Sequence, residues 1–184
     1  MIPYFFINLH VKDFSILSDI KEFFRVGNIS SSKDFALYQV NSLKDLDIFI
    51  IPHFELYPLL TKKKADFLLF KLAIDLIKQK EHKRIEGIHK FIGIKASLNK
   101  GLLKDDLKTS FKNIVPQVRT EVHVPKTINP YWFAGFTSGD GSFSVEIQKS
   151  YTIGHRVAIK FLICQHWEKK LQSNFFSIMP LFFE

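Results

Sequence analysis

Within residues 142–149, polar and apolar side chains alternate strictly from Ser142 to Gln148, and this feature constrains the fold more than any other part of the chain. The apolar members are Phe143, Val145 and Ile147, and the polar members are Ser142, Ser144, Glu146 and Gln148. Successive side chains of a β-strand point to opposite faces, so the pattern predicts a strand with one face toward a core. A second strand is predicted over 156–165, after a turn near Gly154, which makes an antiparallel hairpin.

Apolar residues spaced three and four apart follow Thr61 and predict a long helix with lysines on its other side. Its apolar stripe consists of Ala65, Leu68, Leu69, Leu72, Leu76 and Ile77. A helix is predicted from Asp13 to a stop at Gly27 and Asn28, and another over 42–51 with Pro52 as its stop. Further helices are predicted over 85–98, from Asp105, and over 131–136. Strands are predicted over 4–11 and 35–40. Helices beside antiparallel strands make the fold class α+β.

The segment 114–130 interrupts these patterns. Pro116, Pro125 and Pro130 divide a run of Val, Thr, His and Arg residues that lacks a helical stripe. Proline restricts its own backbone and that of the preceding residue, which favours an extended conformation. With 184 residues the chain can hold two small domains. We therefore predict a linker over 109–129 between the parts 1–108 and 130–184.

The chain is basic, with 26 Lys and Arg residues against 18 Asp and Glu residues and a net charge of +8. This balance favours a polyanionic partner, nucleic acid before a membrane, because basic side chains displace counterions from phosphates. An inert, solvated basic surface would give the same charge, so this alternative stays open. Cys164 is the one cysteine, which excludes a disulfide framework and a thiolate zinc site. No apolar run reaches the length of a membrane span, and we expect no membrane partner.

The segment 130–143 contains the residues with the clearest chemical role. Small residues four apart, at Ala134 and Gly135 and again at Ser138 and Gly139, would let another helix approach backbone to backbone. Asp140 follows at the predicted C-terminus of the helix, where the helix dipole disfavours a carboxylate by about 0.3–1 kcal/mol. A divalent cation would offset this, since a hard cation prefers carboxylate and carbonyl oxygens. The alternative is that Asp140-Gly141 is a simple turn with a solvated side chain.

The string WFAGFTSGDGSF resembles the LAGLIDADG motif of homing endonucleases, with residues 133–141 over its nine positions. Asp140 then falls on the position of the family's metal ligand, and Ser138 on the sixth position, which is often acidic. The strings YPLLTKKKADFLLFKLAIDLI and EGIHKFIGIKASLNKGL resemble the closing helices of the first domain in double-motif enzymes encoded by fungal mitochondrial introns. The resemblance covers residues 4 to about 171.

This resemblance implies the LAGLIDADG fold, an αββαββα-type saddle, and site-specific, metal-dependent cleavage of double-stranded DNA with Mg²⁺. The expected catalytic residues are Asp140, Gln165 and Lys169, and the expected metal ligands are Asp140 and Gly139. The expected DNA-binding residues are Ser142, Ser144, Glu146, Gln148, Lys149, Arg156 and Lys160. The expected helix–helix interface consists of Ala134, Gly135 and Ser138, and Lys62 and Lys63 match the region that supplies a basic residue to the other active site. Each basic residue could equally be a solvated surface charge.

The sequence departs from the family because no helix of residues 1–128 ends in Gly-Asp-Gly or Gly-Glu-Gly. We therefore expect 1–108 to be the C-terminal part of a first domain and 130–184 to be the N-terminal part of a second domain. The fold would then be incomplete in both halves, and we expect this chain to be inactive or incomplete as a nuclease. A maturase acting on intron RNA and a degenerate nucleic-acid-binding remnant are the alternatives. Self-association through the motif helix and a mitochondrial location, without a targeting peptide, are further expectations.

Overall fold

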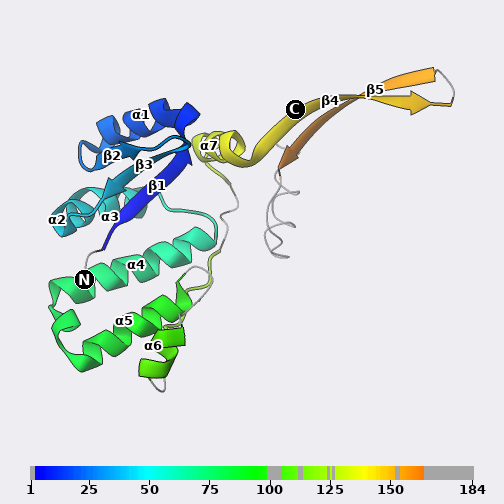
Figure 1. The fold of residues 1–184 in the computed structure, drawn as a ribbon. Helices are drawn as coiled ribbons and strands as arrows, with labels where there is room; N and C mark the ends of the chain where they lie inside the picture. Colours follow the sequence, from blue (N-terminus) through cyan, green and yellow to red (C-terminus); the bar gives the residue numbers. More distant parts are fainter. Residues whose placement is uncertain are drawn as a thin grey trace. The chain divides into compact units, whose positions relative to one another are not determined.

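The computed structural model describes residues 3–98, 105–111, 114–123, 125, 127–151 and 154–163. The chain divides into two compact units between Val122 and His123. This division falls inside the segment 109–129 that is predicted to be a linker. The first unit is a small sheet with helices, and the second unit is a helix that leads into a long hairpin (Figure 1). Helices beside antiparallel sheets confirm the predicted α+β class.

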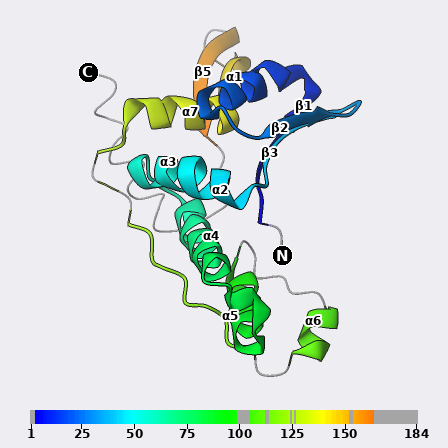
Figure 2. The same ribbon diagram turned by 90° about the vertical axis from the view of Figure 1, so that its left-hand side faces the viewer.

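The first unit contains a three-stranded antiparallel sheet with the strand order β1-β3-β2. Its elements in chain order are β1 (Phe5–His10), α1 (Phe14–Phe24), β2 (Asn28–Ser31), β3 (Phe35–Val40), α2 (Leu43–Asp45), a π-helical turn (Leu46–Ile50), α3 (Ile51–Leu56), α4 (Lys62–Lys78), α5 (Ile85–Ser97) and α6 (Asp105–Ser110). Short 3-10 turns, Val11–Asp13 and Glu81–Lys83, precede α1 and α5. Helices α4 and α5 lie side by side in both views (Figures 1 and 2).

The core of the first unit lies against one face of this sheet. Every second residue of β3 is buried, and α1 contributes the fully buried Leu17. The buried members of the core are Leu17, Ala36, Tyr38, Val40, Leu46, Ile50, Ile51 and Ile74. The Tyr38 hydroxyl donates a hydrogen bond of 3.0 Å to the carbonyl oxygen of Val26, and burial raises the pKa of Tyr38 above its usual value. The polar end of this large core side chain is therefore satisfied inside the unit.

Most predicted elements of the first unit are present, but two helix stops are wrong. Helix α1 ends at Phe24, where Arg25 adopts a left-handed φ of 57°, and Gly27 comes after the stop. Pro52 does not end a helix; it lies in the first turn of α3, where its missing N–H is not needed. The π-helical turn before it allows the chain to stay helical from α2 into α3. Strand β2 is not predicted by the sequence, because Ile29 is its one large apolar residue.

The second unit consists of α7 (Pro130–Asp140), β4 (Gly141–Ser150) and β5 (Gly154–Ile163). The strands pair antiparallel in one continuous register, from Gly141 opposite Ile163 to Ser150 opposite Gly154. This confirms the predicted helix and hairpin, with both strands one or two residues longer at their starts than the patterns indicated. The predicted end of the second strand, Gln165, lies outside the described residues.

Within the described residues, no helix has the length and apolar character that a membrane span needs.

Candidate metal and nucleic-acid site

Helix α7 is defined at its first turn by a side-chain cap. The Asn129 side chain accepts a hydrogen bond of 2.9 Å from the backbone N–H of Tyr131, and Pro130 occupies the first helical turn. Both residue types are those that a helix start favours. On one side of α7 the rings of Trp132 and Phe136 stack with centroids 5.0 Å apart. The cap thus defines where the helix begins, and the stacked pair lies along one side of it.

Next to this aromatic pair, α7 carries the small residues that were expected to form a helix–helix interface. Ala134, Gly135, Ser138 and Gly139 are all exposed. A Cβ atom built on Gly135 or Gly139 meets no atom within 4 Å, and the Ser138 hydroxyl donates to the Ala134 carbonyl oxygen at 2.9 Å. The serine hydroxyl is thus turned back onto its own helix. A second helix could approach this face closely without displacing a side chain of the described residues.

Asp140 is the last residue of α7, and Gly141 joins the helix directly to β4. The backbone N–H of Gly141 donates to the carbonyl oxygen of Thr137. A Cβ atom on Gly141 would lie 2.4 Å from that oxygen, closer than a real contact allows. Glycine is therefore required at this junction, which holds the exposed Asp140 at the point where the helix ends and the strand begins.

The hairpin has two distinct faces, as the alternation predicted. On one face Ser144 is opposite Lys160, Glu146 is opposite Ala158, and Gln148 is opposite Arg156. On the other face Phe143 is opposite Phe161, Val145 is opposite Ile159, and Ile147 is opposite Val157. The six predicted DNA-binding residues Ser142, Ser144, Glu146, Gln148, Arg156 and Lys160 therefore share one face.

Four residues of the polar face form a connected network. Lys160 Nζ donates to Glu146 Oε2 at 2.5 Å, and Gln148 Nε2 donates to the same oxygen at 3.0 Å. The guanidinium of Arg156 donates to Gln148 Oε1 through Nε at 3.0 Å and Nη2 at 2.8 Å. The hydrogen bonds from Lys160 and then Gln148 hold the pKa of Glu146 below its usual value. This face thus offers hydrogen-bonding groups that contact one another in the chain itself.

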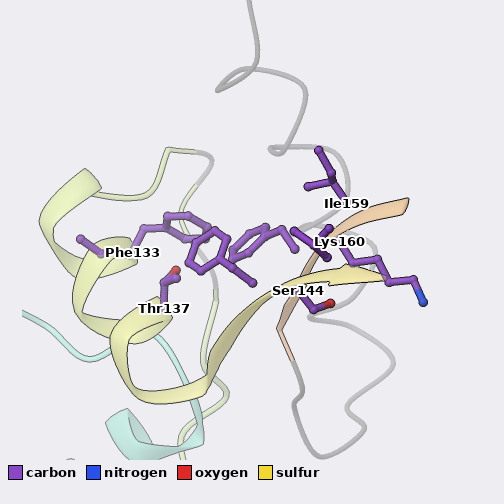
Figure 3. A pocket seen from close by; sticks show the side chains of 9 residues that line it. Phe133, Thr137, Ser144, Ile159 and Lys160 are labelled. Atoms are coloured by element: carbon purple, nitrogen blue, oxygen red, sulfur yellow. The ribbon is translucent and has the colours of Figure 1, made fainter. Parts of the chain in front are cut away.

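The apolar face of the hairpin differs from its prediction. Phe143, Val145 and Ile147 were expected to point to the core, but their exposed fractions are 78%, 70% and 74%. Within the second unit, α7 packs against this face near the Gly141 end, and the described residues of that unit leave the rest of the face uncovered. There a pocket of about 700 Å³ lies between α7 and the hairpin (Figure 3). Its lining residues are Phe133, Ala134, Thr137, Phe143, Ser144, Val145, Ile159, Lys160 and Phe161.

Three of the expected site residues are not placed on the polar face. Lys149 is exposed and follows the alternation onto the side of Phe143, opposite to Gln148. The period of two along the strand already indicates this. Gln165 and Lys169 lie outside the described residues. Lys62 and Lys63 begin α4 of the first unit, where the side chain of Thr61 caps the helix by accepting from the Lys63 N–H at 3.3 Å.

Three comparisons with known proteins bear on this arrangement. The sequence pattern of the family described as LAGLIDADG endonuclease matches residues 2–74 and 133–178. The chain belongs to the LAGLIDADG endonuclease family. In Neurospora crassa, probable intron-encoded endonuclease 3 is 38% identical over 166 residues, which cover 86% of this chain and 30% of that protein. Probable intron-encoded endonuclease 2 from the same fungus is 33% identical over 174 residues, covering 88% of this chain and 37% of that protein.

Solved LAGLIDADG meganucleases share the fold. The chain is similar to I-SmaMI bound to uncleaveable DNA, with a TM-score of 0.89 and 36% identity over 97% of this chain and 62% of that one. It is also similar to I-CpaMI bound to uncleaved DNA, with a TM-score of 0.86 and 41% identity over 98% of this chain and 62% of that one. These matches confirm the predicted LAGLIDADG fold. The chain spans about a third of the length of the two fungal endonucleases and under two thirds of the length of the meganucleases.

A second polar face, on the sheet of the first unit, was not assigned to the site from the sequence. The exposed residues of β1 are Phe6, Asn8 and His10, which pair with Gln39, Leu37 and Phe35 of β3. On β2, Asn28 and Ser30 are exposed and lie opposite Gln39 and Leu37. Amides, a hydroxyl and an imidazole therefore share the sheet face that turns away from the core with the exposed rings of Phe6 and Phe35. The alternation of Asn8 and His10 is visible in the sequence, but by itself it indicates only a strand.

The described residues include the type of ligand that a divalent cation prefers, but too few such ligands for a complete site. At the end of α7, the Asp140 carboxylate and the Gly139 carbonyl supply the hard oxygen donors that Mg²⁺ or Ca²⁺ prefers. Within the described part of the chain, no group of three or more His, Cys, Asp or Glu side chains could hold a metal ion. Asp140 can thus serve as one ligand of a shared site, and further ligands have to come from elsewhere.

Proposed function

We propose that this chain contributes one motif helix and two DNA-reading sheets to a site-specific homing endonuclease that cleaves double-stranded DNA with Mg²⁺. The observation that carries the proposal is the position of Asp140. It ends a helix whose small-residue face is open, and it directly precedes a hairpin whose polar face is ordered. Support comes from the meganucleases I-SmaMI and I-CpaMI, which have this fold and were solved with DNA.

In this proposal the two units belong to two successive LAGLIDADG domains. The first unit supplies the later part of one domain, and α7 with its hairpin opens the next. The separate family matches over 2–74 and 133–178 support this division. Pairing of α7 with a second motif helix, through Ala134, Gly135 and Ser138, would bring a second carboxylate beside Asp140. Self-association of this chain is one source of that second helix.

Asp140 and the Gly139 carbonyl would hold the cation, with Gln165 and Lys169 as the proposed neighbours of the reacting groups. A bound divalent cation activates water and stabilises the leaving oxygen during hydrolysis of a phosphodiester. The chain's own groups orient the DNA. In the proposal two sheet faces contact the major groove of the DNA. The hairpin contributes Ser142, Ser144, Glu146, Gln148, Arg156 and Lys160. The first sheet contributes Asn8, His10, Asn28, Ser30 and Gln39.

Support for the cation comes from the structure of I-SmaMI bound to its uncleaved DNA target in the presence of calcium ions. Calcium and magnesium both prefer oxygen ligands, and the choice of Mg²⁺ is part of the proposal. A mitochondrial location is also part of it, supported by the intron-encoded fungal relatives, one of which is a protein in ND4 intron 1 of Podospora anserina. Intron RNA as a partner stays a prediction, and a splicing assay of the host intron with and without the chain tests it.

The test uses the 184-residue chain with a DNA duplex that spans the insertion site of its own intron. Binding of Mn²⁺ in the DNA complex, followed by the relaxation of water protons, measures the cation site even if cleavage needs a second motif. We expect Asp140→Asn to weaken Mn²⁺ binding at least tenfold and to abolish any nicking of the duplex. Asp19→Asn, which removes an exposed acid of α1, is the matched control and should leave both unchanged. Equal Mn²⁺ binding by the wild type and Asp140→Asn would refute the role of Asp140.

A further inference from the structure

Residues 114–122, called the strap below, run extended along α5 in the first unit. The backbone N–H of Gln117 donates to the Gly93 carbonyl oxygen at 3.0 Å, and the Ser97 hydroxyl donates to the Gln117 carbonyl oxygen at 2.6 Å. A Cβ atom on Gly93 would lie 2.5 Å from the carbonyl oxygen of Val115. The strap thus lies backbone to backbone on α5, and it can do so because residue 93 is a glycine.

Arg119 connects the strap to two helices at once. Its Nη1 donates to the carbonyl oxygen of Ser97 at the end of α5 and lies 2.9 Å from Asp66 Oδ1. Its Nη2 donates to the carbonyl oxygen of Lys62, the first residue of α4, at 3.5 Å. The Arg119 side chain is 30% exposed and that of Asp66 is 13% exposed, so this cluster is largely shielded from water. One planar guanidinium therefore joins the C-terminal end of α5 to the first turn of α4.

The first turn of α4 carries a concentration of positive charge. Lys62, Lys63 and Lys64 are consecutive, and the first turn has no acidic residue. Cations are disfavoured at a helix N-terminus, where the dipole is positive, and neighbouring lysines also repel each other. Asp66 lies one turn further on and is 3.8 Å from Lys63 Nζ. The strap brings Arg119 to the same carboxylate and to the Lys62 backbone. Arg119 adds a further cation, so it holds this turn through its hydrogen bonds and the shared Asp66 carboxylate and does not reduce the positive charge.

We propose that Arg119 is a positioning residue: by docking the strap on α4 and α5, it sets the first turn of α4 so that Lys62 and Lys63 are held in place to contact the DNA phosphates. This inference rests on the proposed function. It assigns a role to a segment that the sequence indicated only as a linker. Lysine could not replace Arg119, because an ammonium group on a flexible stem does not reach three acceptors in one plane.

The experiment measures how the affinity of the chain for a DNA duplex depends on salt, by fluorescence anisotropy between 50 and 300 mM KCl. The slope of log K against log salt is negative, and each phosphate contact makes it steeper by about 0.9. Slopes below are given as magnitudes. Lys62→Ala/Lys63→Ala should lower the slope by up to about 2. Arg119→Ala, Arg119→Lys and Gly93→Ala should each lower it by a similar amount. Adding Arg119→Ala to the lysine double variant should lower it no further.

The variants separate positioning from direct contact. Gly93→Ala leaves every charge of the chain in place and displaces the whole strap, Arg119 included, so it tests the docking of the strap. Direct contact is tested by the triple variant: a further loss of slope when Arg119→Ala is added to Lys62→Ala/Lys63→Ala would show that Arg119 itself contacts phosphates and would overturn the positioning role. Arg84→Ala is the matched control, since Arg84 is 75% exposed and lies 3.9 Å from Glu81. Its slope should stay within 0.9 of the wild type, the change expected from at most one phosphate contact.

Hydrogen exchange of the free chain is the second readout, and it does not depend on DNA binding. We expect the amides of the first two turns of α4 to exchange at least tenfold faster in Arg119→Ala and Gly93→Ala, with the sheet amides of β1 and β3 unchanged. If the wild type does not bind DNA, the proposed function fails while the exchange result still decides whether the strap fixes α4. Two results would overturn the positioning role. One is unchanged exchange in both Arg119→Ala and Gly93→Ala. The other is a wild-type salt slope in both of these variants when the lysine double variant has lost slope.

Discussion

Replacement of Gly141 by alanine tests the junction that holds Asp140. The added Cβ would lie 2.4 Å from the Thr137 carbonyl oxygen and 2.6 Å from Thr137 Cγ2. Ordinary contact begins at about 3.5 Å, so the helix end and the strand must separate by about 1 Å. Overpacking of this kind costs about 1–3 kcal/mol, and the cap hydrogen bond from Gly141 to Thr137 adds about 1 kcal/mol when it is lost. We expect a loss of about 2–4 kcal/mol in the free energy of unfolding of the second unit.

The same chemical change six residues earlier should have the opposite sign. Gly135 lies inside α7, and a Cβ atom added there would meet no atom within 4 Å. Gly135→Ala should therefore gain about 0.5–1 kcal/mol from the higher helix propensity of alanine. Urea unfolding followed by tryptophan fluorescence reports on the second unit, because Trp132 and Trp167 both follow His123 in the sequence. An unfolding free energy of Gly141→Ala within about 0.5 kcal/mol of the wild type, which is the usual range for an inconsequential surface change, refutes the argument.

Two other changes probe the core and the hairpin. Tyr38→Phe removes the donor to the Val26 carbonyl and should lower the free energy of unfolding of the first unit by about 1 kcal/mol, measured by urea denaturation followed by circular dichroism. Glu146→Gln removes the carboxylate that Lys160 contacts, and we expect tighter binding to a nonspecific duplex with a slope on log salt that is steeper by about 1. Because the pKa of Glu146 is lowered from 4.5, its ion pair is fully formed above that value and is lost as the pH falls through the lower folded-state pKa. An NMR titration of the Glu146 side chain that shows a pKa at or above 4.5 contradicts this pairing.

The parts of the fold that the sequence predicted depend on local patterns. Helix α4 has a Thr61 cap and an apolar stripe at helical spacing, and β4 alternates from Ser142 to Gln148, so each could be placed from its own residues. Strand β2 has only the sequence Asn-Ile-Ser-Ser, and it becomes a strand because β3 offers it a hydrogen-bonding edge. The predicted stop at Pro52 is wrong because a π-helical turn precedes it, and nothing in the local pattern indicates that turn.

The candidate site likewise has features that the sequence predicts and features that it does not. The position of Asp140 after a helix of small residues was predictable, because the helix and the strand were both predictable and they adjoin. The contact of Lys160 with Glu146 depends on the register of the hairpin, which neither strand defines by itself. The contact of Arg119 with the Lys62 backbone joins residues 57 positions apart and could not be predicted from spacing. Long-range polar contacts of this kind come from tertiary packing, and periodicity along the chain does not encode them.

The polar face of the hairpin and the basic first turn of α4 differ in what they can contribute to DNA binding. On the hairpin, the charge of Lys160 is already compensated by Glu146, and the Arg156 guanidinium already donates to Gln148. DNA would have to exchange these contacts for contacts with bases, so the net gain in affinity is small but depends strongly on which base is present. The lysines at the start of α4 form a dense positive charge, with Asp66 as a nearby acid. In the proposed function, sequence discrimination therefore comes from the hairpin, and the salt-dependent part of the affinity comes from charges such as Lys62 and Lys63, whose position depends on Arg119.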